Sequence, residues 1–364
     1  MRVLIFCHSI LSDWNHGNAH FLRGVTTELI ARGHDVQVFE PEDAWSVKNL
    51  VADQGAAILD QFRSAYPNIH SERYDPAKFE LPAKLANANL VIVHEWNDPA
   101  LVRAIGEHHK THRGYRLFFH DSHHRSVTAP AEMARFDLTH YDGVLAFGRV
   151  VRDLYLANAW ARRAWTWHEA ADTRVFSPRA SRAKEGDLVW IGNWGDNERT
   201  AELNEFLFEP VKALKLKAKV FGVRYPAEAL RKLEAAGIEY GGYLPNFHAP
   251  EVYGHYRLTL HVPRAPYAKA LPGIPTIRMF EALACAIPLF SAPWRDSENL
   301  FHHNEDYGTA RNGLEMTKML EGALANLEQA TARARCGFEA IQQRHTCAHR
   351  VDELLEIYRG MEVN

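Results

Sequence analysis

Short apolar runs alternate with segments of helical spacing through the first half of the chain. The runs predict strands at residues 2–7, 35–40, 90–94, 117–120 and 144–147. Helices are expected between them at residues 20–32, 46–64, 98–110 and 149–159. Gly33 directly follows the first of these helices and is expected to end it. Strands that alternate with helices in this way favour a parallel sheet with right-handed crossovers.

The same alternation restarts in the second half of the chain. It predicts strands at residues 188–191, 219–222, 258–262 and 288–291, helices at 227–236 and 276–286, and a mostly helical tail over 314–362. The switch falls near residues 173–185, where small and charged residues surround Pro178. We therefore predict an α/β protein with two Rossmann-like, doubly wound parallel-sheet domains at residues 1–172 and 173–345. A C-terminal helix over 346–364 is expected to pack back on the first domain.

Ligands of doubly wound sheets bind outside the carboxyl ends of the strands. Two such domains that face each other are expected to form a cleft at the carboxyl ends of both sheets. Polar clusters that directly follow the predicted strands are therefore the candidate functional residues.

Composition narrows the class of partner. An apolar content of 46% is enough for two cores, and a formal net charge of −3 predicts no nucleic-acid or anionic-membrane surface. The first apolar run is too short for a signal peptide, and no stretch approaches the ~20 apolar residues of a membrane span. Four cysteines without CxxC spacing fit a reducing compartment. We expect a cytoplasmic protein without an integral membrane segment; its oligomeric state cannot be read from the sequence.

Residues 275–294 are the most informative segment, because they combine a loop, a short helix and a buried strand. Arg278 and Glu281 are three residues apart and so share one face near the helix start. A helix N-terminus favours anions, and an arginine there adds a bidentate phosphate contact. A carboxylate one turn later can accept hydrogen bonds from ribose hydroxyls, which indicates a nucleotide. The alternative is that Glu281 only forms a salt bridge with Arg278.

The segment Phe280-Glu-Ala-Leu-Ala-Cys-Ala-Ile-Pro288 resembles the donor-binding segment of retaining GT-B glycosyltransferases, with Ala286 in place of the usual glycine. The chain is most similar to the CgeB-like group, named for spore-maturation proteins. The resemblance covers most of the chain and is strongest at the N-terminus and at residues 94–148, 167–200 and 275–294. Many GT-B enzymes carry a second glutamate eight residues before the ribose one. Gly273 occupies that position here, which leaves open the contact to the transferred sugar.

Two polar clusters follow strands in the first half. Gly17 and Asn18 lie at the mouth of a helix, where N–H groups can face a phosphate or a sugar; an ordinary helix entry is the alternative. Glu95 follows the strand at 90–94 and is a candidate for acceptor binding, or for a base in an inverting reaction. Asp98 precedes Pro99 and is expected to cap the next helix.

His120 and Asp121 end the following strand, just before His123 and His124. The resemblance implies that a histidine at this position contacts the transferred sugar, and His120 is our candidate. Asp121 is a further candidate base if the reaction inverts. A metal site formed by these histidines and Asp121, or a solvated polar loop, are the alternatives.

The second domain opens with a glycine-containing loop over 192–199. Gly195 allows close approach of the backbone to a ligand, and Arg199 can hold a diphosphate; pairing of Arg199 with Glu198 or Glu202 is the alternative. GT-B relatives often carry an arginine and a lysine here, and this chain lacks the lysine. The second cation must then be Arg264, Lys269 or Arg278, of which Arg278 is best placed. Further along, Tyr243 is a candidate contact for the nucleobase, or a core residue.

The resemblance implies a hexosyltransferase-type enzyme. It would move a sugar from a nucleoside-diphosphate sugar to an unidentified acceptor, with retention and without a metal. No cofactor is expected, and a UDP-sugar is the default donor. Two alternatives stay open: a nucleotide-sugar epimerase or hydrolase on the same fold, and a metal-dependent hydrolase that uses residues 120–124.

Overall fold

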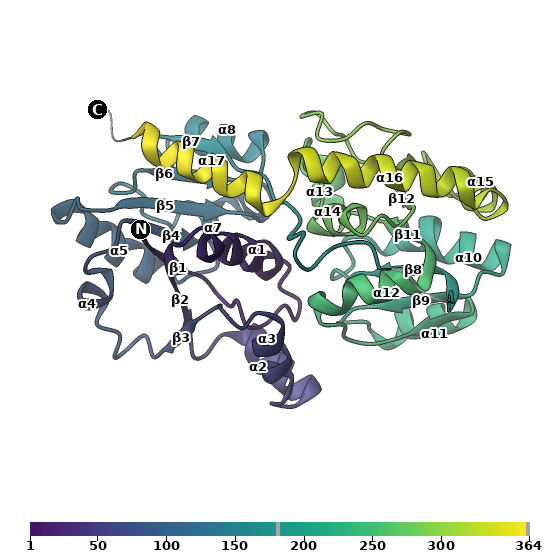
Figure 1. Cartoon of the computed structure of the whole chain (residues 1–364), viewed down its shortest axis with the longest axis horizontal. Coiled ribbons are helices and arrows are strands. Elements are labelled where there is room, and N and C mark those ends of the chain that lie inside the picture. The colour runs from purple at the N-terminus through teal and green to yellow at the C-terminus, as the bar shows by residue number, and fades with distance from the viewer. Residues whose placement is uncertain (180–182, 362–364) are drawn as a thin grey trace. The chain divides into compact units, whose positions relative to one another are not determined.

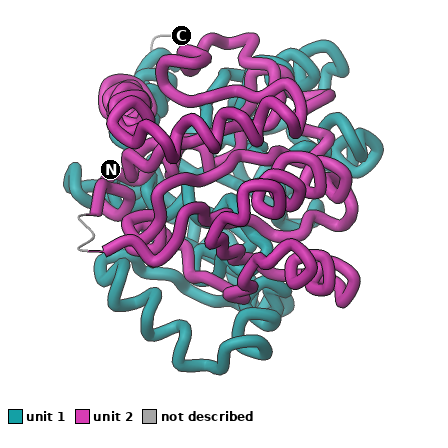
Figure 2. The backbone as a smooth tube through the Cα atoms, turned by 90° about the vertical axis from the view of Figure 1, so that its right-hand side faces the viewer, with its two compact units in different colours: residues 1–169, 347–364 teal, residues 170–346 magenta. Residues whose placement is uncertain are grey.

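The computed structural model describes residues 1–179 and 183–361. The chain divides into unit 1, Met1–Glu169 with Cys347–Asn364, and unit 2, Ala170–Thr346, drawn in different colours in Figure 2. The predicted switch at 173–185 includes residues 180–182, which lie outside the described residues. Residues 362–364, at the end of the predicted C-terminal helix, also lie outside them.

Unit 1 is built on a parallel sheet with the strand order β3-β2-β1-β4-β5-β6-β7 (Figure 1). The strands are β1 (Arg2–Phe6), β2 (Asp35–Pro41), β3 (Ser71–Tyr74), β4 (Leu90–His94), β5 (Arg116–Asp121), β6 (Gly143–Ala146) and β7 (Ala164–Thr166). Every residue of β4 is buried, as expected for a central strand in a sheet that is covered on both faces.

The helices of unit 1 connect these strands and cover the sheet. They are α1 (Asn18–Ala31), α2 (Trp45–Gln54), α3 (Ile58–Ala65), α4 (Leu81–Leu85), α5 (Pro99–Thr111), α6 (Arg125–Thr128), α7 (Pro130–Met133), α8 (Arg149–Ala157) and α17 (Cys347–Gly360). The last of these returns from the end of the chain and packs against α1. Arg32 fixes this contact, because its guanidinium donates to Asp352 at 2.5 Å and to the carbonyl of Ala348 at 3.0 Å.

Unit 2 repeats the design with a sheet of order β10-β9-β8-β11-β12-β13. Its strands are β8 (Gly186–Ile191), β9 (Ala218–Phe221), β10 (Ile238–Tyr240), β11 (Tyr256–His261), β12 (Leu289–Ser291) and β13 (Gly308–Thr309). Its helices are α9 (Thr200–Leu203), α10 (Glu209–Leu214), α11 (Ala227–Ala235), α12 (Ala249–His255), α13 (Ala265–Ala270), α14 (Ile277–Ala284), α15 (Gly313–Ala325) and α16 (Leu327–Arg344), with short η1 (Asn204–Phe208) and η2 (Asn246–His248). One core of buried aliphatic and aromatic side chains joins the sheet to α10, α11 and α15.

The predicted fold class is confirmed: both units are doubly wound parallel α/β units. Asp98 caps α5 as expected, since its carboxylate accepts the N–H of Ala100 at 2.7 Å. The prediction of a single helix over 46–64 was wrong, because residues 55–57 separate two helices, α2 and α3. The sequence prediction missed β3, β7, β10 and β13. These short strands lie near the sheet edges and carry few buried residues, so they lack an apolar run.

Each sheet has one point where the strand order reverses direction. In unit 1 it lies between β1 and β4, and in unit 2 between β8 and β11. The loops that follow these strands leave toward opposite faces of the sheet, which opens a crevice at the strand ends where doubly wound proteins bind ligands. The candidates Asn18 and Glu95 follow β1 and β4, and Arg199 follows β8, whereas His120 ends the neighbouring strand β5 and Tyr243 follows β10.

A buried arginine holds the loop after β1. Arg23 on α1 donates from Nε to the carbonyl of Ile10 at 2.8 Å and from Nη2 to that of Leu11 at 3.1 Å. Its Nη1 forms an ion pair with Asp13 at 2.7 Å, and both side chains are almost fully buried. The guanidinium also lies over the ring of Phe62 at 4.9 Å. The loop that leads to Gly17 and Asn18 is thus tied to the helix that follows it.

We expect Arg23→Leu to destabilise the protein by about 3 kcal/mol, because it removes one partner of a buried ion pair and the donors to two carbonyls. Urea-induced unfolding measures this change. Arg63→Leu is the matched control: Arg63 pairs with Asp60 at the surface, where the two side chains are 64% and 73% exposed, so the change should stay within about 0.5 kcal/mol. Equal effects of the two substitutions would contradict the role given to Arg23.

Candidate functional site

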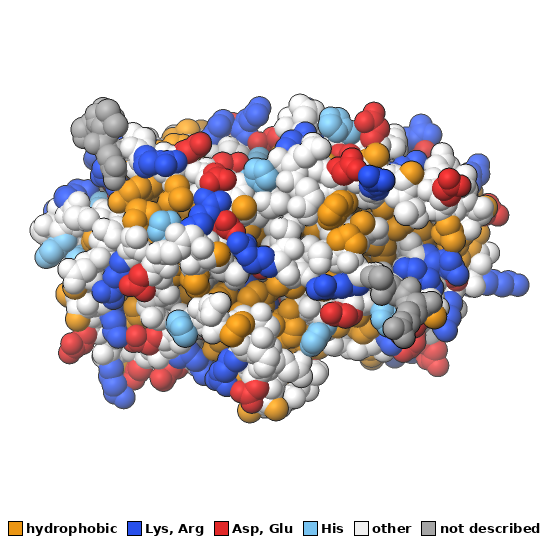
Figure 3. Space-filling model, in the orientation of Figure 1, with side chains coloured by type: hydrophobic (Ala, Val, Ile, Leu, Met, Phe, Trp, Pro, Cys, Tyr) orange, Lys and Arg blue, Asp and Glu red, His pale blue; other side chains and the backbone are white. Residues whose placement is uncertain are grey.

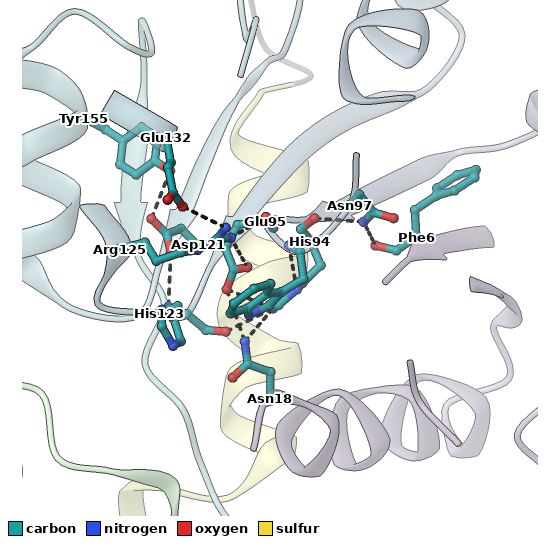
Figure 4. A network of polar contacts seen from close by, with 12 residues as sticks. Phe6, Asn18, His94, Glu95, Asn97, Asp121, His123, Arg125, Glu132 and Tyr155 are labelled. Atoms are coloured by element: carbon teal, nitrogen blue, oxygen red, sulfur yellow. Dashed lines mark hydrogen bonds and ion pairs between the residues drawn. The ribbon is translucent and has the colours of Figure 1, made fainter. Parts of the chain in front are cut away.

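Polar residues from three neighbouring segments meet at the carboxyl edge of the unit 1 sheet (Figure 4). Asn18 begins α1 after β1, Glu95 directly follows β4, and Arg125 begins α6 after β5. The Asn18 amide donates to Glu95 Oε1 at 3.1 Å. Arg125 Nη2 donates to Glu95 Oε2 at 3.0 Å and to the Glu95 carbonyl at 2.7 Å. The structure thus brings two predicted residues, Asn18 and Glu95, into direct contact. Gly17, a third predicted residue, directly precedes Asn18 in the sequence.

Two buried carboxyl groups share this edge of the sheet. Burial raises the pKa of Glu95 well above its usual value, and the nearby Asp121 raises it further. Burial likewise raises the pKa of Asp121 to about 6. Asp121 accepts the Tyr155 hydroxyl on Oδ2 at 2.9 Å and the His123 N–H on Oδ1 at 3.1 Å. Both oxygens of each carboxyl group are therefore already hydrogen-bonded.

His120 lies at the end of β5 in an aromatic environment. Its ring is 4.9 Å from that of Trp167, 5.1 Å from that of His94 and 5.8 Å from that of Phe21, measured between centroids. Neither ring nitrogen has a hydrogen-bond partner among the described residues. Burial lowers the pKa of His120 to about 3, so the ring is neutral at pH 7. A buried histidine with two unsatisfied nitrogens is unusual in a folded protein, so it remains a candidate functional residue.

The histidines around His120 are held by other contacts. His123 packs its ring against Trp96 at 5.1 Å, and His124 Nδ1 lies 2.8 Å from Thr128 Oγ1. Among residues 1–179 and 183–361, no group of three or more His, Cys, Asp or Glu side chains is placed to hold a metal ion. This arrangement does not favour the metal-dependent hydrolase that uses residues 120–124.

A second buried arginine holds the loops at the reversal point of the unit 2 sheet. Arg199 donates from Nη1 to the carbonyl of Val262, after β11, at 2.9 Å, and from Nη2 to the carbonyl of Asn193, after β8. It also lies over the ring of Trp190 at 4.9 Å. These contacts differ from the surface pairing with Glu198 or Glu202 that the sequence left open, because the side chain is buried and its donors are directed to main-chain carbonyls.

Positive charge gathers around Gly195. This residue has φ +84°, and a Cβ built on it would lie 3.2 Å from both Arg199 Nε and Arg264 Nε. Burial, followed by the charges of Arg264 and Arg278, lowers the pKa of Arg199 to about 9. Arg199 Nε is buried without a hydrogen-bond partner in the described part of the chain. The loop therefore places a glycine backbone next to guanidinium groups, an arrangement that suits an anion.

Glu281 lies on α14 with both oxygens engaged. Arg278 Nη1 donates to Oε2 at 2.8 Å, and Asn246 Nδ2 donates to Oε1 at 2.9 Å. The Glu281 side chain is only 1% exposed, whereas that of Arg278 is 24% exposed. The salt bridge that the i, i+3 spacing allowed is therefore present. Tyr243 lies half-buried in the loop between β10 and η2, the short helix that begins at Asn246.

His261, at the end of β11, positions the start of α14. Its Nε2 lies 3.1 Å from Oγ1 of Thr276, the residue before the helix, and its Nδ1 lies 2.8 Å from Oγ of Ser291. Sequence reasoning did not single out His261 or Asn246 in unit 2, nor Tyr155 in unit 1. Each reaches its partner across 15 or more residues of sequence, so no local spacing could reveal the contact.

Comparisons with known proteins show which family and fold the chain resembles. Residues 199–356 match the family model described as glycosyl transferase-like, a span that begins at Arg199 and includes Arg278 and Glu281. No curated protein sequence matches the chain. The structure does resemble solved structures over its whole length at low sequence identity.

Three of these structures illustrate the resemblance. A glycosyltransferase from Rickettsia africae is 12% identical and has a TM-score of 0.69, with 100% of this chain and 99% of that chain covered. A sucrose-phosphate synthase from Thermosynechococcus elongatus is 13% identical, with a TM-score of 0.69 and 99% of each chain covered. HepE from Anabaena, in complex with UDP-glucose, is 11% identical, with a TM-score of 0.70 and coverage of 99% and 100%. The two parallel-sheet units thus have the GT-B fold.

Two further properties concern the charge of the surface and the character of the helices. Acidic and basic side chains are interspersed on the face drawn in Figure 3, in line with the small net charge of the chain. In the described part of the chain, no helix has both the length and the apolar character needed to cross a membrane.

We expect His120→Phe to reduce the loss of stability at low pH. The folded-state pKa of His120 is about 3, below the value of about 6.5 in an unfolded chain, so the unfolded state binds more protons as the pH falls below 6.5. Between pH 7.5 and 5.5, His120 alone should cost wild type about 1.4 kcal/mol that the variant does not lose.

Chemical denaturation of both proteins at the two pH values measures this difference. Glu95 and Asp121, whose raised pKa values act in the opposite direction, are present in both proteins and largely cancel in the comparison. At pH 7.5 the variant should be at least as stable as wild type, because a phenyl ring suits the aromatic pocket. Identical pH dependence of the two proteins would contradict a neutral, buried His120.

Proposed function

We propose that the protein is a glycosyltransferase that takes a sugar from a nucleoside-diphosphate sugar, with retention of anomeric configuration and without a metal ion. The observation that carries the proposal is the group of three arginines at the reversal point of the unit 2 sheet: Arg199, Arg264 and Arg278. Burial is the main cause of the lowered pKa of Arg199, and repulsion from Arg264 and Arg278 lowers it further. Arg264 also lies 3.4 Å from Glu198, and Arg278 pairs with Glu281 at 2.8 Å. A bound diphosphate would relieve the repulsion between the guanidinium groups and stabilise the loop over 192–199.

The three arginines have different proposed roles. Arg199 already donates to two carbonyls, so it chiefly holds the loops and offers Nε and its charge. Arg264 and Arg278 have side chains that are 22% and 24% exposed and are the candidates for direct diphosphate contacts. Their charge would stabilise the leaving diphosphate, where each well-placed donor is worth roughly 3 kcal/mol in the transition state. The N–H groups around Gly195 would add to this site.

The nucleoside would occupy the neighbouring part of unit 2. Asn246 and Arg278 orient the Glu281 carboxylate, whose oxygens are the proposed acceptors for the ribose hydroxyls. Tyr243, three residues before Asn246, is the proposed contact for the base. Uracil is the proposed base: the Anabaena protein HepE, which shares the fold, was solved with UDP-glucose.

Unit 1 would supply the groups that act on the sugar and the acceptor. His120 is proposed to orient the transferred sugar through its unpaired ring nitrogens, and Gly17 and Asn18 to approach it from the start of α1. Glu95 and Asp121 each have both oxygens hydrogen-bonded, so neither is a ready base for the acceptor. The lack of a ready base supports retention, because a retaining reaction requires no enzymic base.

We also propose that the protein belongs to the CgeB-like group, which its sequence resembles.

A thermal-shift screen of nucleoside diphosphates and their sugars tests the proposal directly. It is run in EDTA and again with magnesium, manganese or zinc. UDP at one hundred times its dissociation constant should stabilise the protein by about 2.7 kcal/mol, and EDTA should not abolish this shift. No shift with any nucleoside diphosphate would overturn the proposal. A shift that needs a metal would overturn only its metal-free part.

We expect Glu281→Ala to weaken UDP binding by about tenfold or more, because the variant loses the ribose acceptor and the group that orients Arg278. Isothermal titration calorimetry measures the affinity, and circular dichroism checks the fold. Glu228→Ala is the matched control, since Glu228 is an exposed helical glutamate that pairs with Lys232. Glu281→Gln replaces the alanine variant if the latter does not fold. Wild-type affinity in a folded Glu281 variant would remove the ribose assignment.

A further inference from the structure

A carboxylate lies where the chain departs from the usual donor motif. Gly273, in the loop that leads into α14, occupies the position at which many GT-B enzymes carry a glutamate. A Cβ built on Gly273 would lie 2.6 Å from Cγ and 2.7 Å from Oε1 of Glu298. The space that a side chain at position 273 would enter is therefore already filled by the side chain of Glu298, which comes from the loop after β12.

The two loops that meet here are held together by hydrogen bonds. The N–H of Gly273 donates to the carbonyl of Arg295 at 2.7 Å. Asp296 accepts the N–H groups of Leu300 at 3.1 Å and Phe301 at 2.9 Å, which closes the turn that carries Glu298. Gly273 has φ +91°, a conformation that favours glycine. The backbone and the contact with Glu298 thus both exclude a side chain at position 273.

This contact involves the loop that connects two parts of the proposed nucleotide site. The loop over 271–276 joins α13, which begins just after Arg264, to α14, which carries Arg278. Leu271 and Ile274 anchor the loop in the core, where they are almost fully buried. Glu298 is only half-buried, so part of its side chain is exposed to solvent. Carboxylates are strong acceptors for hydroxyl groups, the groups that distinguish one sugar from another.

We propose that Glu298 supplies the carboxylate that binds the hydroxyl groups of the transferred sugar, in place of a side chain at position 273. The inference rests on the proposed function, because it needs a sugar attached to the diphosphate. It assigns Glu298 a role in donor specificity. The nucleotide part of the donor depends on Arg278 and Glu281 and is independent of Glu298.

The test compares the affinities of UDP and of a panel of UDP-sugars by isothermal titration calorimetry. Wild type is expected to prefer one UDP-sugar over the others. Glu298→Gln should weaken binding of that UDP-sugar by about tenfold while UDP affinity changes by less than about twofold. Glu305→Gln is the matched control, an exposed glutamate on the same connection between β12 and β13, and should change neither affinity.

A second variant tests the contact itself. Gly273→Ala keeps Glu298 but places a methyl group in its space, so it should reproduce the sugar-selective loss. Unchanged UDP-sugar affinity in Glu298→Gln, with UDP still bound, would overturn the role of Glu298 and leave the proposed function intact. Equal losses for UDP and UDP-sugar would also overturn it, because the effect would then not depend on the sugar. If wild type binds neither ligand nor any other nucleoside diphosphate, the proposed function fails and this inference with it.

Discussion

A buried guanidinium that satisfies main-chain carbonyls holds the loop after the first strand in each unit. In unit 1 Arg23 donates to the carbonyls of Ile10 and Leu11, and in unit 2 Arg199 donates to those of Asn193 and Val262. Loops at the carboxyl ends of parallel strands leave carbonyls without ladder partners, and an arginine can satisfy several from one rigid fork. The cost of burying the charge is offset by an ion pair with Asp13 in unit 1. In the described part of the chain, Arg199 donates to two neutral carbonyls and has no comparable ion pair.

The strand ends of the two units carry different kinds of polar side chain. Unit 1 places neutral histidines and hydrogen-bonded carboxyl groups at the strand ends, an environment suited to hydroxyl groups. Unit 2 places arginines, a glycine backbone and the Arg278–Glu281 pair there, an environment suited to phosphate and ribose. A sugar nucleotide contains both kinds of group. These side chains match the roles proposed for the two units, hydroxyl binding in unit 1 and phosphate and ribose binding in unit 2.

Several buried polar groups at these sites lower the stability of the fold, because they lack hydrogen-bond partners or bury a carboxyl group. Both nitrogens of His120 and the Nε of Arg199 are buried without a hydrogen-bond partner among the described residues, and each such group costs about 1–3 kcal/mol. Burial also works against the charged forms of Glu95 and Asp121. Departures from good local satisfaction are typical of functional sites, where a ligand supplies the missing partner. His120 lies at the end of β5 and Arg199 in the loop after β8, both on the side of the sheet where doubly wound proteins bind ligands.

Local pattern alone determined most of the fold. The apolar run at 90–94 predicted β4 to the residue, and the Asp98-Pro99 pair predicted the cap of α5, because these signals act within a few residues. The Arg278–Glu281 pair was readable for the same reason. Tertiary structure alone brought Asn246 to Glu281 across 35 residues, Arg199 to Val262 across 63, and Glu298 against Gly273. Such contacts depend on how strands are ordered in a sheet, and strand order leaves no local trace because each strand's apolar pattern is the same whichever neighbours it has.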